Sequence, residues 1–192
     1  VNIGECENTT EFIWATKVDG SFDDTGRGIS AVPDAVYVTG YYNTPVNVYS
    51  ANGSIFSNLT ASNAGAYIVK WDNDGQAQWA TKVDGVFNDQ GYSISAVCDA
   101  VYATGNYPAS ANVYSANGSI FSNLTASDYG AYIVKWDNDG QAQWATKVDG
   151  SGFDQGRGIS AVSDAVYATG YYFSSANIYS ANGSNQPEYF SN

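Results

Sequence analysis

The chain repeats itself every 65 residues. The heptapeptide Trp-Ala-Thr-Lys-Val-Asp-Gly begins at Trp14, Trp79 and Trp144, two steps of 65. Residues 66–85 recur unchanged at 131–150, and residues 48–62 recur unchanged at 113–127. Because a repeat of this length is one supersecondary unit that must stack on its neighbours to bury a core, it constrains the fold more than any single motif.

Each unit is predicted to form four short strands. In the second complete unit they cover residues 92–97, 100–106, 131–136 and 142–148. These segments are rich in Val, Ile, Tyr, Trp and Thr and alternate with small or polar residues, as strands do. The tight turn at residues 98–99 and Asn138-Asp139-Gly140 would close two successive hairpins. We therefore expect an all-β fold of four-stranded antiparallel sheets, which need stacking to bury both faces.

The repeated motifs resemble the SBBP-type β-propeller repeat. They are Asp-x-Gly-x-x-Ile-Ser-Ala-Val, Asp-Ala-Val-Tyr-(Val/Ala)-Thr-Gly, Ala-Tyr-Ile-Val-Lys-Trp-Asp-x-Asp-Gly and Gln-Trp-Ala-Thr-Lys, at residues 24–40, 66–82, 89–105, 131–147 and 154–170. The resemblance implies one propeller blade per unit, commonly in secreted or surface proteins, and carries over no catalytic residues. The chain departs from the pattern in its long segment between the second and third strands. A β-trefoil is the alternative fold, although its units are usually shorter and lack the Asp-Ala-Val-Tyr strand.

The phase of the repeat divides the chain into two whole blades and two halves. Aligning Trp14 with Trp79 makes residues 1–20 the third and fourth strands of a blade. Complete blades then cover residues 21–85 and 86–150, and residues 151–192 supply a first and a second strand. Closing the halves within one chain would give fewer blades than the roughly 4 to 8 that propellers use. We therefore expect residues 151–192 to pair with residues 1–20 of a neighbouring subunit, head-to-tail, which removes two open sheet edges.

Six N-glycosylation sequons without a middle proline are present. Their asparagines are Asn8, Asn52, Asn58, Asn117, Asn123 and Asn182. Chance and duplication could produce them, since Asn, Ser and Thr are abundant. However, each complete unit keeps two sequons six residues apart, in a segment predicted to be an exposed loop between the second and third strands. We expect these four to carry N-linked glycans that shield strand edges, which implies passage through a secretory pathway.

The two cysteines do not recur between units. Cys98 stands in the turn between the first and second strands, where the other units have Pro33 and Ser163. Cys6 replaces a repeated tryptophan near the turn between the third and fourth strands. Since these turns lie on the same side of a blade, head-to-tail assembly would bring Cys6 near Cys98 of the neighbour, and an oxidising compartment would allow an inter-subunit disulfide. A bridge within one chain and two unrelated thiols are the alternatives.

Composition argues against several classes of function. The formal charge is −12, so the surface should repel nucleic acid and anionic lipid. No histidine is present for a Ser-His-Asp or Cys-His arrangement, and two cysteines cannot build a zinc site alone. The acidic turns at 72–75 and 137–140 lack calcium-loop spacing and are explained as hairpin turns. Carboxylate pairs for glycoside hydrolysis would fall in such turns. We therefore expect no enzyme, no metal and no cofactor.

The remaining features concern the ends, the membrane and the aromatic residues. No run approaches the roughly 20 apolar residues of a membrane span, so no membrane insertion is expected. The chain starts at Val1 and holds no Met, and Asn192 stands where a sequon asparagine recurs, so we expect a part of a longer product.

Most of the 16 Tyr and 5 Trp fall at repeated strand positions and are expected in the core. The exceptions, which could be exposed, follow the second strand: Tyr41, Tyr42, Tyr171 and Tyr172.

These observations together predict a glycosylated extracellular structural protein, a head-to-tail subunit of a surface fibre, sheath or appendage. The alternative is a carbohydrate-binding or adhesive propeller module of a larger surface protein, with a glycan as its ligand. Fibre imaging and glycan binding distinguish the two hypotheses.

Overall fold

The computed structural model describes residues 13–43 and 45–181. Within these residues the chain forms strands and turns and no helix, which confirms the expected all-β fold. The strands are β1 (Val18–Gly20), β2 (Asp24–Val32), β3 (Ala35–Asn43), β4 (Val46–Tyr49), β5 (Ile55–Leu59), β6 (Ala64–Asp72), β7 (Ala77–Gly85), β8 (Gln90–Val97), β9 (Ala100–Tyr114), β10 (Ile120–Asp137), β11 (Ala142–Gly150), β12 (Gln155–Ala161), β13 (Val166–Tyr171) and β14 (Ala176–Ile178).

Two four-stranded antiparallel sheets follow one another along the chain. The first repeat (residues 21–85) forms β2-β3-β6-β7, and the second repeat (residues 86–150) forms β8-β9-β10-β11. The four strand ranges predicted for the second repeat fall inside β8 to β11. The registers correspond residue by residue, because Ala66 pairs with Val83 and Ala131 pairs with Val148. Two consecutive hairpins per repeat are therefore confirmed.

The segment between the second and third strands is a hairpin, and the prediction of a loop was wrong. In the first repeat β4 and β5 pair with Asn47 opposite Asn58, and in the second repeat β9 and β10 themselves extend through this segment. The tip is tight, and Gly53 adopts a φ of +82° there. Val46 and Leu59 are buried while the asparagines lie on the other face. This alternation was present in the sequence but was hidden by the many Asn and Ser residues.

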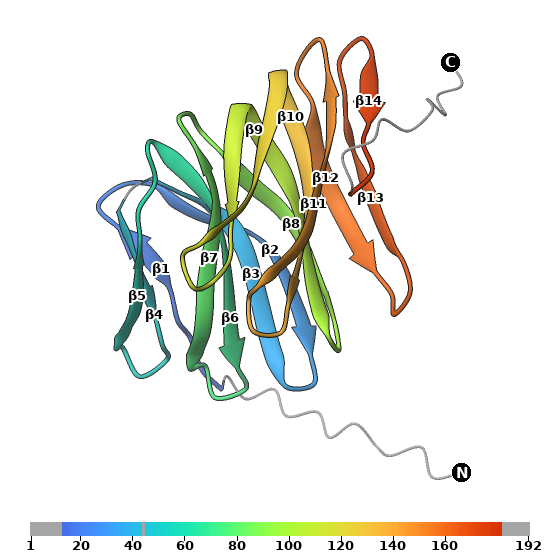
Figure 1. The fold of residues 1–192 in the computed structure, drawn as a ribbon. Coiled ribbons are helices and arrows are strands. Elements are labelled where there is room, and N and C mark those ends of the chain that lie inside the picture. Colours follow the sequence, from blue (N-terminus) through green and yellow to red (C-terminus); the bar gives the residue numbers. More distant parts are fainter. Residues whose placement is uncertain (1–12, 44, 182–192) are drawn as a thin grey trace, which may run out of the picture.

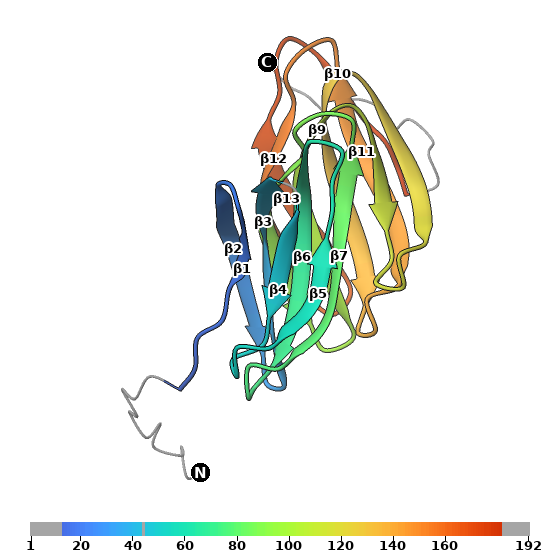
Figure 2. The ribbon, with the colours of Figure 1, turned by 90° about the vertical axis from the view of Figure 1, so that its left-hand side faces the viewer.

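This outer hairpin links each unit to the preceding one. Its first strand pairs with the fourth strand of the unit before, with Val18 opposite Val48 and Val83 opposite Val113. In addition, β2 contacts β8 and β8 contacts β12, so the sheets lie face to face in chain order (Figure 1). The view in Figure 2 places the first repeat in front of the second. Successive units thus contact one another both edge to edge and face to face.

The core lies between the two complete sheets. Ala66, Ile68 and Val83 on the first sheet pack with Tyr132, Val134 and Trp136 on the second, all of them buried. The alternate residues Tyr67, Val69 and Trp71 face the opposite way, toward Trp14 and Val18. Both faces of the first sheet are therefore apolar, which is why one unit alone cannot satisfy its own surface.

The glycine of the repeated Thr-Gly pair is required by a close approach of two strands. A Cβ on Gly105 would lie 1.9 Å from the carbonyl oxygen of Gln90, and a Cβ on Gly40 would lie 1.8 Å from that of Thr25. No side chain fits at either position without separating the first and second strands. This explains physically why the motif ends in glycine in every unit.

An aspartate lies at the start of the first strand of each unit, half-buried in the first repeat and fully buried in the second repeat and the third unit. Asp24, Asp89 and Asp154 each accept a hydrogen bond from the backbone N–H of the glycine that ends the preceding fourth strand, Gly20, Gly85 and Gly150 respectively. The other carboxylate oxygen accepts from the backbone N–H of Asn43 in the first repeat and of Phe173 in the third unit.

The second repeat lacks this second donor. Pro108 occupies the position of Asn43 and has no N–H, and Asp89 Oδ1 has no partner among the described residues although Asp89 is fully buried. Burial raises the pKa of Asp89 to about 8, and the neighbouring Asp84 adds to this against the lowering effect of the Gly85 N–H. Asp89 therefore takes up a proton on folding near neutral pH.

We predict that Pro108→Ala flattens the pH dependence of stability. Wild-type Asp89 has a pKa of about 8 when folded and about 4 when unfolded. Its protonation therefore stabilises the fold below pH 4, and this contribution is lost as pH rises toward 8. A donor at position 108 stabilises the carboxylate by about 1–3 kcal/mol, mainly at the higher pH. Denaturant unfolding at pH 5 and pH 8 measures it, with Asp89→Asn as the non-titrating control. An equal fall in wild type and Pro108→Ala would contradict the assignment.

Candidate functional site: an open face at the end of the sheet stack

In the described part of the third unit, β12 and β13 form a two-stranded sheet, while β14 pairs with β11 of the second repeat. Positions that are buried in the complete repeats are exposed on it. Tyr37 is 1% exposed and Tyr102 is 8% exposed, whereas the equivalent Tyr167 is 66% exposed. The third unit therefore presents an open sheet edge and an uncovered apolar face.

A hydroxyl on this edge lacks the acceptor that its equivalents have. Thr39 Oγ1 donates to the carbonyl of Tyr67 at 2.8 Å, and Thr104 Oγ1 donates to that of Tyr132 at 2.6 Å. In both cases the acceptor belongs to the third strand of the same sheet. Thr169 occupies the same position on β13, is exposed, and has no such acceptor among the described residues. A third strand in the register of the other two sheets would supply this acceptor.

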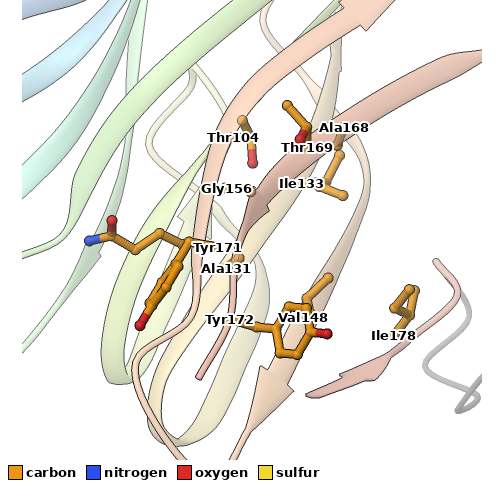
Figure 3. A pocket seen from close by; sticks show the side chains of 12 residues that line it. Thr104, Ala131, Ile133, Val148, Gly156, Ala168, Thr169, Tyr171, Tyr172 and Ile178 are labelled. Carbon is orange, nitrogen blue, oxygen red and sulfur yellow. The ribbon is translucent and has the colours of Figure 1, made fainter. Parts of the chain in front are cut away.

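A cleft of about 400 Å³ adjoins this edge. As Figure 3 shows, Ala131, Ile133 and Val148 of the second repeat line it together with Thr169 of β13 and Ile178 of β14, and Ile178 pairs with Val148. The three residues of the second repeat are equivalent to Ala66, Ile68 and Val83. Those three are covered by the next repeat, so the cleft marks the place of side chains that a following third strand would supply.

The opposite end of the stack carries the complementary half of the same contact. Ile29 on β2 is 72% exposed, whereas its equivalent Ile94, which faces the first repeat, is 5% exposed. Between the units, Ser30 Oγ accepts from the Ala96 N–H and Ser95 Oγ accepts from the Ala161 N–H, both at 3.0 Å. At the two ends of the stack, Ser160, which is equivalent to Ser30 and Ser95, and Ala31, which is equivalent to Ala96 and Ala161, are both exposed. The same contact could therefore form between two chains.

A group of three donors on the first repeat holds a turn of the second repeat. Trp79 Nε1 and Lys70 Nζ both donate to the carbonyl oxygen of Asn138, at 2.9 and 3.1 Å. Tyr37 OH donates to Asn138 Oδ1 at 3.2 Å. The Asn138 Nδ2 donates in turn to the carbonyl of Cys98 at 2.8 Å. We call this arrangement the latch, and the Cys98 contact confirms that the two turns of a repeat lie side by side.

At one end of the stack the described residues show only the tryptophan contact of the latch, and at the other end the latch is open. Trp14 Nε1 donates to the carbonyl of Asn73 at 2.8 Å. In the second repeat Tyr102 and Trp144 have their ring centroids 5.9 Å apart, as Tyr37 and Trp79 do, and Lys135 lies 5.6 Å from the centre of Tyr102. No hydrogen bond joins Trp144 Nε1 to any described residue. Sequence reasoning treated these aromatic residues as core and the Asn as a turn former, because the contact spans two units.

The four sequons of the complete repeats lie on the outer hairpins. Asn52 and Asn117 are exposed at the tips, and Asn58 and Asn123 are exposed on strands β5 and β10. Asn58 Nδ2 lies 3.1 Å from Asn47 Oδ1, and Asn123 Nδ2 lies 2.9 Å from Asn112 Oδ1. All four side chains are exposed and therefore accessible to modification, and their glycosylation stays a prediction. Asn8 and Asn182 lie outside the described residues.

The other candidate residues divide between surface and core. Cys98 is exposed at the β8–β9 turn, Cys6 lies outside the described residues, and the disulfide stays a prediction. Tyr171 and Tyr172 are exposed, whereas Tyr42 is fully buried, so the suggestion of exposure was wrong for Tyr42. Tyr41 is half-buried beneath the Arg27 guanidinium, 4.7 Å from its ring centre.

The described residues show neither a metal-binding cluster nor a membrane-spanning helix. No group of three or more His, Cys, Asp or Glu side chains is placed to hold a metal within residues 13–43 and 45–181. In the same part of the chain, no helix is long and apolar enough to cross a membrane.

We predict that Asn138→Ala destabilises the protein, because the substitution removes an acceptor for Tyr37 and a donor to Cys98. The expected loss in the free energy of unfolding is about 1–3 kcal/mol, measured by urea denaturation. Asp139→Ala is the matched control, because Asp139 is exposed in the same turn. Equal stability of the two variants would show that the latch contributes nothing.

Comparison with known proteins supports a repeat architecture at a coarse level. The chain is similar to an uncharacterized WD repeat-containing protein, L264, of Acanthamoeba polyphaga mimivirus, with 29% identity over 168 residues. The similar region covers 74% of this chain and 12% of the viral protein, so the chain spans about an eighth of its relative. No family model matches the chain. The all-β fold and this similarity fit a β-propeller-like protein.

Proposed function

We propose that this chain is a structural repeat protein without catalytic activity, a subunit that assembles head-to-tail into an extracellular fibre, sheath or appendage. The observation that carries the proposal is the pair of open ends. Ile29 at one end and Tyr167 at the other are exposed, although their equivalents inside the stack are buried. A contact between two different surfaces of the same chain continues from subunit to subunit, as a ring or a filament.

In the finer form of this proposal each 65-residue unit is one blade of an SBBP-type repeat. The half-blade at residues 151–192 takes residues 1–20 of the next subunit as its third and fourth strands. Added main-chain pairing on the free edge of β13 would supply the affinity, as in β-strand addition generally. A disulfide between Cys6 and Cys98 of neighbouring subunits would secure the contact, which is supported by the exposure of Cys98.

The proposed glycans occupy a different surface from the proposed contact. β5 pairs with β4 on one side only, so its other edge is open, and Asn58 lies on this strand. A glycan there would shield the edge from unwanted strand pairing. An extracellular location is proposed because N-linked glycans imply passage through a secretory pathway.

The absence of catalysis is proposed because the most perturbed carboxyl group is inaccessible. Asp89, whose pKa is raised to about 8, is fully buried between strands and cannot meet a substrate. Its environment is explained by the Pro108 substitution within the repeat. The raised pKa of Asp89 therefore reflects burial in the fold rather than a role as the acid or base of a reaction.

The alternative function is carbohydrate binding or adhesion. It is favoured by the exposed aromatic residues Tyr171, Tyr172 and Phe173, which follow one another at the end of β13. Aromatic faces stack on sugars, and Tyr171 and Tyr172 line the cleft. Saturable binding of one saccharide on a glycan array by the non-assembling chain would favour this alternative over the structural role.

We predict that Tyr167→Asp abolishes self-association without unfolding the chain. The side chain is 66% exposed in the single chain but equivalent to the buried Tyr102, so a charge there is tolerated only while the face is open. Analytical ultracentrifugation measures this, with Ile55→Asp on the outer hairpin, also exposed, as the control. Because each chain carries a charge of −12, higher salt should favour the associated form. A monomeric wild type at all concentrations would contradict the proposal.

We predict that native material carries modified Asn52, Asn58, Asn117 and Asn123 and a peptide pair linked through Cys6 and Cys98. The asparagines are exposed on the outer hairpins, and Cys98 is exposed. Mass spectrometry of digests without reduction, compared with reduced and deglycosylated digests, measures both modifications. Unmodified peptides spanning all four asparagines would remove the glycoprotein assignment, and free thiols at both cysteines would remove the disulfide.

A further inference from the structure

The open latch of Tyr102, Lys135 and Trp144 has the geometry of a binding site whose occupied form is visible one repeat earlier. We propose that this latch and the adjoining cleft select a hairpin of third and fourth strands from another copy of the repeat, and that the Asn-Asp-Gly turn of the hairpin is the recognised element. The inference rests on the proposed head-to-tail assembly only for the source of the hairpin.

The latch requires an asparagine. In the occupied copy the Asn138 backbone oxygen accepts two hydrogen bonds, its Oδ1 accepts a third, and its Nδ2 donates to a main-chain carbonyl. The open copy offers the equivalent donors Trp144 Nε1, Lys135 Nζ and Tyr102 OH. The carbonyl of Ser163 takes the place of that of Cys98. An aspartate could not donate to this carbonyl, and an alanine could satisfy only the backbone part.

The latch also requires a glycine two residues later. Gly140 has a φ of +74°, and a Cβ on it would lie 2.8 Å from the ring of Trp79 and 2.6 Å from Ala116 Cβ. Gly75 meets Trp14 in the same way, with a φ of +71° and 2.8 Å to the ring. Any side chain at this position must displace the tryptophan or strain the turn. The indole of Trp144 therefore selects glycine in the occupant.

The cleft requires large apolar side chains on the incoming third strand. In the occupied copy, Tyr132, Val134 and Trp136 cover the small and branched residues of the first repeat. In the open copy the equivalent small and branched residues are Ala131, Ile133 and Val148, which line the cleft. Thr169 is placed to donate to a main-chain carbonyl of the incoming third strand, as Thr39 and Thr104 do within their own sheets. The sequence Ala-Tyr-Ile-Val-Lys-Trp-Asp-Asn-Asp-Gly, found at 66–75 and 131–140, meets every requirement.

Residues 1–20 meet only some of these requirements. Asn8 aligns with Asn138, but Thr10 aligns with Gly140, and Asn2, Gly4 and Cys6 align with Tyr132, Val134 and Trp136. The docking site should therefore bind a hairpin with the sequence of residues 66–85 more tightly than residues 1–20. Without the proposed disulfide, head-to-tail assembly through residues 1–20 would consequently be weak and reversible, and a Thr10→Gly chain should associate more strongly under reducing conditions.

The test is a titration of labelled synthetic peptides with the full chain, followed by fluorescence anisotropy. A peptide with the sequence of residues 66–85 should bind saturably. Peptides carrying Asn73→Ala or Gly75→Thr, and a peptide of residues 1–20, should each bind at least about tenfold more weakly. On the full chain, Trp144→Phe should weaken binding of the 66–85 peptide, because it keeps an aromatic ring and removes the Nε1–H donor. Phe56→Leu on the outer hairpin is the matched control.

The outcomes separate the docking site from the assembly. Failure of the 66–85 peptide to bind, or equal binding of its Asn73→Ala and Gly75→Thr forms, overturns selection by the turn. Equal affinity of the 1–20 peptide also overturns this selection while leaving head-to-tail assembly intact. Tight binding of the 66–85 peptide to a chain that does not self-associate supports the docking site and removes the assembly through residues 1–20. A scrambled peptide controls for non-specific binding.

Discussion

The structure depends on the burial of apolar side chains between successive sheets. Tyr132, Val134 and Trp136 cover Ile68 and its neighbours, and no strand within the first repeat could do this in their place. A sheet that is apolar on both faces is stable only as an inner layer, and at roughly 1.5–3 kcal/mol for each large buried side chain this contact dominates the energetics. The exposed faces at the two ends follow from the same constraint.

Polar contacts set how the sheets are aligned, because apolar burial alone allows them to slide. The asparagine in each occupied turn and the serine contacts between first strands connect units at fixed positions. Each is a directional hydrogen bond across a repeat boundary. It uses a donor or acceptor that has no partner within the described part of its own repeat. Alignment is therefore specified between units, and an incomplete unit displays unused donors together with unused apolar surface.

Duplication with divergence explains the exceptions to the pattern. The three aspartates occupy equivalent positions, but Pro108 removes the donor of one of them, Asp89, whose pKa burial raises to about 8. Similarly, Tyr92 replaces an arginine and lies 4.4 Å and 4.6 Å from the guanidinium carbons of Arg27 and Arg157. Single changes between near-identical units thus expose what each position does.

The sequence alone determined the repeat, the four-stranded antiparallel order and the turn positions, because local alternation and turn chemistry act within a few residues. It did not reveal the outer hairpin, where Asn and Ser obscured the alternation of Val46, Val48 and Leu59. Only the tertiary structure decided that Asn138 is held by Trp79 and that Tyr42 is buried while Tyr171 is not. These outcomes depend on which unit lies opposite, and that is a property of stacking rather than of any local segment.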